Sequence, residues 1–146
     1  MDLLAAGATA LVLAHATYTD VRWRVIRNWT VAGGAGVGLA LGATTHGVSG
    51  LLAGLEGLVL GAAWWVAVRH LHLGAGDAKL AMAVGALLGP AIALAGPALG
   101  YMLCALALLP WIGWRQARRL PWRNAALPMA PWIAAGTALI ALSGLG

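Results

Sequence analysis

Apolar stretches alternate with short polar connections along the whole chain. The apolar stretches cover about residues 3–19, 29–45, 50–68, 78–95, 97–113 and 129–145. Each stretch has the length of a short membrane-spanning helix. In lipid, a segment of this kind can form all its backbone hydrogen bonds only as a helix. The pattern therefore predicts an all-α integral membrane protein with a bundle of six transmembrane helices. Because no long linker interrupts it, residues 1–146 are predicted to form a single membrane-embedded domain.

The composition supports a membrane protein and argues against a water-soluble one. Of the 146 residues, 62% are hydrophobic and only 9% are charged, whereas about 25% of the residues of a soluble domain are charged. Cys104 is the only cysteine, so the chain offers neither an internal disulfide nor a cysteine pair for zinc.

The basic residues give the predicted bundle an orientation. All nine fall in or at the edge of the first, third and fifth connections: Arg22, Arg24, Arg27, Arg69, Lys79, Arg115, Arg118, Arg119 and Arg123. The positive-inside rule makes that side cytoplasmic and puts the N- and C-termini on the outer side. All eight tryptophans lie near the same boundary, as residues of an interfacial belt do. The net charge of +5 is thus explained by orientation and by contact of the basic loops with anionic lipid, and not by nucleic-acid binding.

The carboxylates are the candidates for chemistry, because ionisable groups in a membrane are costly. Asp20 directly follows the first apolar stretch and Asp77 directly precedes the fourth, so both are predicted at the cytoplasmic boundary. Two facing carboxylates can share a proton, so that one activates water and the other polarises a carbonyl group. The dipoles of their own helices favour Asp77, near an N-terminus, as the more acidic member, with Asp20 holding the proton more often.

Other polar residues leave alternatives open. Glu56 lies in the middle of the third stretch and is expected to be a buried, protonated or hydrogen-bonded carboxyl. With Asp20 and Asp77 it could form the relay of a small proton or ion transporter. Such a relay must reach both faces of the membrane, but the outer half of the bundle contains only one further carboxylate, Asp2.

The histidines next to Asp77 raise the question of a metal. His70 and His72 could bind a metal ion, but interfacial histidines are the simpler interpretation. No metal ion and no organic cofactor are therefore predicted.

Four segments form a recognisable arrangement: DVRWRVIRN at 20–28, GAGDAKL at 74–80, AMAVGALLG at 81–89 and LPMAPWIAAG at 127–136. They resemble, in order and spacing, the D-x-R-x-x-x-I-P-N, G-x-G-D-x-K-L and closing P-[FY]-[GA]-P-[FL]-[LI]-A-x-G segments of the type IV prepilin peptidases, including the helix after GxGD. The resemblance covers residues from about 14 to 137.

The resemblance implies a GxGD aspartic protease with Asp20 and Asp77 as the catalytic pair. The matching motif positions, expected to position substrate, are Gly74, Gly76, Lys79, Arg22 and Asn28. At Gly74 and Gly76 the absence of a Cβ allows close approach of an extended peptide and a positive φ.

The implied activity is removal of the leader from type IV prepilin-like precursors at the cytoplasmic face of the inner (plasma) membrane. The partners would be the leader peptide with its adjacent hydrophobic helix, and the bilayer. Preflagellin or pseudopilin precursors are alternative substrates for the same chemistry. The chain lacks a cysteine-rich segment and so resembles the short Flp-pilin-type enzymes, which implies peptidase activity without N-methyltransferase activity. Arg27 stands where the family usually has proline, so the turn after the first span is expected to differ.

Overall fold

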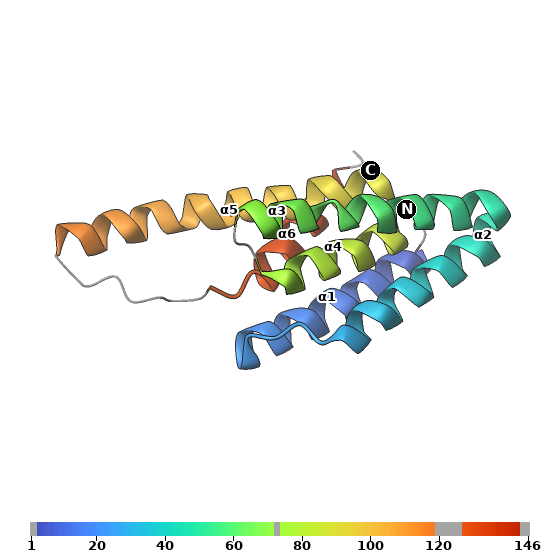
Figure 1. Ribbon diagram of the computed structural model, residues 1–146, viewed down its shortest axis with the longest axis horizontal. Coiled ribbons are helices and arrows are strands. Elements are labelled where there is room, and N and C mark those ends of the chain that lie inside the picture. The colour runs from blue at the N-terminus through green and yellow to red at the C-terminus, as the bar shows by residue number, and fades with distance from the viewer. Residues whose placement is uncertain (1–2, 72–73, 119–126, 144–146) are drawn as a thin grey trace.

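The computed structural model describes residues 3–71, 74–118 and 127–143, and this part of the chain contains helices and no strands. The helices are α1 (Leu3–Trp23), α2 (Asn28–Ala62), α3 (Trp64–Leu71), α4 (Ala75–Leu88), α5 (Pro90–Ala117) and α6 (Ala130–Leu142) (Figure 1). The predicted all-α class is therefore confirmed for the described residues.

Two of the predicted spans are the arms of α2, which folds back on itself (Figure 1). The reversal is at Gly47, whose φ of 63° and ψ of −141° are non-helical. Such a positive φ costs glycine little, because it has no Cβ. A Cβ on Gly50 would collide with the backbone carbonyl of Gly42, so small residues let the two arms touch. The second arm continues into α3 after Ala62.

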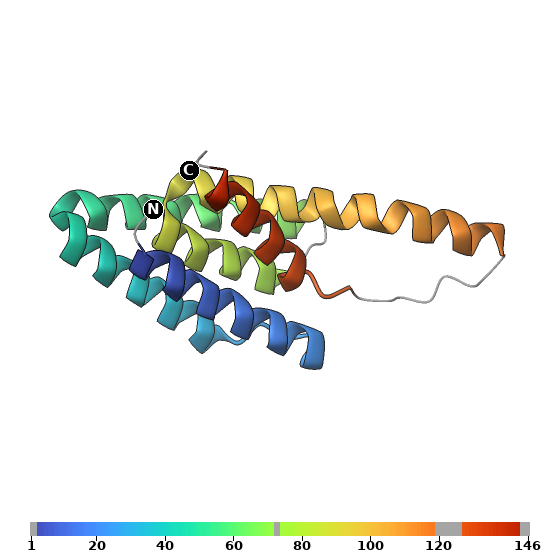
Figure 2. The same cartoon turned by 180° about the vertical axis from the view of Figure 1, so that it is seen from behind.

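The next connection lies earlier than the apolar stretches predict. α4 ends at Leu88, Gly89 has φ 90°, and Pro90 begins α5. A glycine with positive φ ends a helix, and proline at the first helical position suits the start of the next one. As a result α4 has only 14 residues and α5 has 28. The second half of α5 projects beyond the other helices (Figures 1 and 2).

α4 is the central helix of the bundle and contacts each of the others. Ala78, Leu80, Ala81 and Ala83 are fully buried on it. Glycines on the second arm of α2 face it closely: a Cβ on Gly57 would collide with the backbone of α4. These glycines therefore serve helix packing, since small residues let helix backbones approach one another.

Two stretches of the described residues form helices long and apolar enough to cross a membrane. They are Asn28–His70, which includes the reversal in α2, and Pro90–Trp114. Ala130–Leu142 is a shorter apolar helix. Large apolar side chains also lie exposed on the outside of the bundle, including Leu11 and Leu106. A surface of this kind is suited to lipid.

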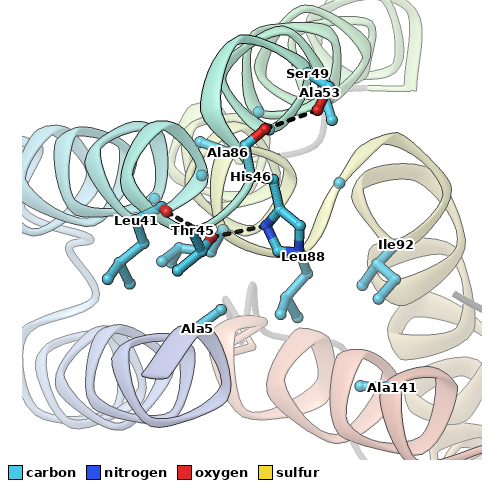
Figure 3. Close-up of a pocket in the computed structure, with 16 residues that line it drawn as sticks. Ala5, Leu41, Thr45, His46, Ser49, Ala53, Ala86, Leu88, Ile92 and Ala141 are labelled. Carbon is cyan, nitrogen blue, oxygen red and sulfur yellow. Dashed lines mark hydrogen bonds between the residues drawn. The ribbon is translucent and has the colours of Figure 1, made fainter. Parts of the chain in front are cut away.

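A cavity of about 460 Å³ lies at the end of the bundle where α1 begins and α6 ends. Figure 3 shows Ala5 of α1 and Ala141 of α6 facing it, together with His46. The hydroxyl of Thr45 donates to the carbonyl of Leu41 at 2.7 Å and lies 2.7 Å from Nδ1 of His46. The remaining lining is mostly apolar and includes no carboxylate.

Candidate active site

A second cavity, of about 560 Å³, is lined by both Asp20 and Asp77. Asp20 lies near the end of α1, and Asp77 lies in the first turn of α4. Each residue is only 8% exposed. From Ala5 to Asp20 the rise of α1 is about 22 Å, so this cavity and the first one lie at opposite ends of the bundle. The tertiary structure therefore brings the two predicted catalytic residues to one cavity.

Each carboxylate accepts a hydrogen bond from a segment far away in the sequence. Oδ2 of Asp20 accepts from the backbone N–H of Ala130 at 2.9 Å. Ala130 is the first residue of α6, so the positive end of that helix dipole points at Asp20. Oδ2 of Asp77 accepts from the hydroxyl of Tyr101 on α5 at 2.7 Å.

The surroundings of Asp77 oppose the acidity expected from its own helix dipole. Asp77 precedes the apolar stretch 78–95 and lies outside that predicted span. Burial raises the pKa of its carboxyl, the hydrogen bond from Tyr101 lowers it, and the charge of Asp20 raises it, with a raised pKa as the net result. Desolvation favours the neutral form of a carboxyl group. The interpretation of Asp77 as the more acidic member is therefore not supported.

The two motif glycines make contacts within the protein. A Cβ on Gly76 would lie 3.2 Å from the side chain of Ile26, and a Cβ on Gly74 would lie 3.0 Å from Oδ2 of Asp77. Gly74 has φ −68° and ψ 129°, which other residues adopt freely, so the positive φ expected there is wrong. Tight packing against Ile26 therefore favours glycine at position 76 independently of any substrate.

A hydrogen bond links the motif segment at 74–80 to the one at 20–28. Nζ of Lys79 on α4 donates to Oδ1 of Asn28 in the first turn of α2 at 2.8 Å. Lys79 also lines the aspartate cavity. Arg22 is exposed and does not line that cavity, whereas Arg24, which has φ 56°, does.

The turn after α1 keeps a backbone that proline would tolerate. Arg27 is the N-cap of α2 and has φ −72°, close to the value that the proline ring imposes. Its guanidinium lies 5.5 Å from the ring centroid of Trp23. The turn therefore differs from the family's usual proline turn in its side chain and not in its backbone φ.

Tyr101 and the amide of Ala130 are site groups that the sequence patterns missed. One sequence feature could have identified Tyr101 as a site residue: it carries a hydroxyl group within an apolar stretch. Leu127 and Met129, from the segment before α6, also line the cavity. The closing motif segment, residues 127–136, therefore contributes to the site together with the segments at 20–28 and 74–80.

The remaining candidates lie elsewhere. Glu56 is exposed on the second arm of α2 and lines neither cavity, so the expectation of a buried carboxyl is wrong. His70 is exposed, and the described residues include no cluster of three potential metal ligands. The predictions for Asp2, His72, Arg119 and Arg123 fall outside the residues that the structure describes.

Comparison with known proteins identifies a family. No curated protein and no solved structure matches the chain. The sequence model of the type IV leader peptidase family matches residues 7–142. This match includes both aspartates and all the segments that meet at their cavity. The chain belongs to the type IV leader peptidase family.

Proposed function

We propose that this chain is an aspartic endopeptidase that removes the leader from type IV prepilin-like precursors, with Asp20 and Asp77 as its catalytic residues. Membership of the family implies leader peptidase activity on such precursors. The observation that carries the aspartic assignment is the pair of buried carboxylates, from different helices, that lines one cavity. The volume of about 560 Å³ is in the range of ligand-binding pockets.

The contacts of the two carboxylates divide the roles. Asp20, which faces the N-terminus of α6, takes a proton from the attacking water. Asp77, whose pKa is raised, gives its proton to the scissile carbonyl oxygen, and a gem-diol forms. The C–N bond then breaks as Asp20 gives its proton to the leaving amine and Asp77 recovers one from the diol. The pair ends with one proton, as it began.

The motif residues hold this arrangement together. Gly76 admits Ile26, and Lys79 binds Asn28, so the helix that carries Asp77 is attached to the segment that follows Asp20. Of these residues, Ile26, Gly76 and Lys79 line the cavity and would position the substrate there. Arg22 is exposed, and its contact with substrate stays a prediction from the family motif.

The membrane arrangement belongs to the same proposal. Residues 1–146 form one peptidase domain of six spans, with both termini outside and the aspartates at the cytoplasmic face of the inner membrane. Support comes from Ala5 and Ala141, which line one cavity at the far end, and from Arg24 at the aspartate end. The basic loops would contact anionic lipid.

Two alternatives concern the substrate and the class of protein. Preflagellin and pseudopilin precursors would use the same chemistry. A proton or ion transporter is not favoured, because Glu56 is exposed and does not line the aspartate cavity. The dyad activates water alone, so the proposal includes no cofactor.

The test is cleavage of a purified prepilin-like precursor by the purified chain. Asp20→Asn and Asp77→Asn should each lower kcat by about 10³-fold or more, because asparagine can neither accept nor donate the required proton. The double variant should be about as inactive as either single one, since the two groups act as a unit. Glu56→Gln is the control and should keep most of the activity. Cleavage retained by either aspartate variant would overturn the assignment.

A further inference from the structure

Tyr101 holds Asp77 from a helix that carries none of the family motif segments. Its hydroxyl donates to Oδ2 of Asp77 at 2.7 Å, and it lines the same cavity. A tyrosine hydroxyl that is half-buried needs a polar partner, and a carboxylate is a strong one. The contact joins the middle of α5 to the first turn of α4.

Trp64 supports Tyr101 from the other side. The two rings are stacked, with centroids 5.6 Å apart and planes inclined by 23°. Nε1 of Trp64 also donates to the carbonyl of Ala93 at 3.1 Å, about two turns before Tyr101 on α5. Trp64, predicted as a belt or packing residue, thus contacts α5 at two points and limits the movement of the tyrosine ring.

We propose that Tyr101, braced by Trp64, is a positioning residue that fixes the rotamer and the proton affinity of Asp77. The inference rests on the proposed function and adds two residues to it. With Oδ2 held by Tyr101, the other oxygen, Oδ1, carries the proton of the dyad. The hydrogen bond also makes Asp77 a stronger acid toward the carbonyl of the substrate, because it stabilises the ionised form.

The expected effect of Tyr101→Phe is on turnover and on the pH profile. A hydrogen bond to a charged group is strong enough that its loss should lower kcat by roughly 10- to 100-fold, with KM changed less than about threefold. Asp77 should lose its proton at higher pH, so the alkaline limb of the kcat profile should move up by about one pH unit. A role in folding alone would lower the yield or thermal stability and leave both limbs in place.

A second substitution tests the same contact without removing it. Fluorotyrosine at position 101 keeps the shape of the ring and is a stronger hydrogen-bond donor, so the alkaline limb should move to lower pH.

Substitutions of Trp64 test the stacked ring. Trp64→Phe keeps a ring for the stack and should have a small effect on kcat and on the pH profile. Trp64→Ala should reproduce part of the Tyr101→Phe effect.

The matched control is Tyr18→Phe, which makes the same chemical change at an exposed tyrosine of α1. It should leave kcat and the pH profile unchanged. The positioning role is overturned if Tyr101→Phe and Tyr101→fluorotyrosine both leave the two limbs in place while Asp77→Asn is inactive. Cleavage by Asp77→Asn would instead overturn the proposed function.

Discussion

Asp20 and Asp77 show how an interpretation at the scale of one residue depends on distant contacts. Considered alone, Asp20 lies near a helix C-terminus and Asp77 near a helix N-terminus. The structure adds the N-terminal amide of α6 beside Asp20, and burial around Asp77. Both additions oppose the dipoles of the residues' own helices, so the roles that we propose are the reverse of those predicted from the sequence.

Metal dependence is a prediction at the residue scale. Because two carboxylates with one proton can activate water, cleavage should stay within about twofold of its normal rate after treatment with a strong chelator. The measurement is the initial rate of precursor cleavage before and after chelation. Loss of activity that zinc restores would instead assign His70 and His72 as ligands and contradict the aspartic mechanism.

At the scale of elements, α4 determines how closely the bundle packs. It is buried along most of its length, and the arms of α2 reach its backbone through glycines. The hydrophobic effect does not drive helices together in lipid, so this close packing is a main source of stability. The contact also matters for the site, because α4 carries Asp77 and Lys79 in its first turns.

A prediction at this scale compares two glycines of α2. Gly57→Ala would place a Cβ against the carbonyl of Gly85, and backbone atoms cannot move aside. It should destabilise the fold by about 2 kcal/mol, as overpacking does. Gly36→Ala is the matched control, because no atom lies within 4 Å of its added Cβ. Thermal unfolding in detergent should show a lower midpoint for Gly57→Ala only, and equal midpoints would contradict the packing argument.

At the scale of the whole molecule, the two cavities define the axis of the bundle. The chain reverses at Gly47, between two residues that line the far cavity, His46 and Ser49. Arg24 lines the aspartate cavity. The fold therefore places residues 24 and 47 at opposite ends of the bundle. The distribution of basic residues predicts which end faces the cytoplasm.

Reporter fusions test that orientation. Fusions after residues 24 and 119 should report the cytoplasm, and one near residue 47 should report the outside. If residues 24 and 47 were on the same side, the six-span arrangement would be wrong. If all three readings were reversed, the aspartates would lie at the outer face, away from the predicted substrate side.

The sequence by itself determined the all-α class and the family, and it predicted the two aspartates as the catalytic pair, because hydrophobicity and short motifs are local properties of the chain. Only the tertiary structure decided where α4 ends, since Gly89 and Pro90 lie inside a continuous apolar run that hydropathy cannot divide. It also decided that Tyr101 and the amide of Ala130 donate hydrogen bonds to the aspartates and that Trp64 stacks on Tyr101. Those contacts join residues far apart in the chain, and they arise from helix packing, which no local pattern encodes.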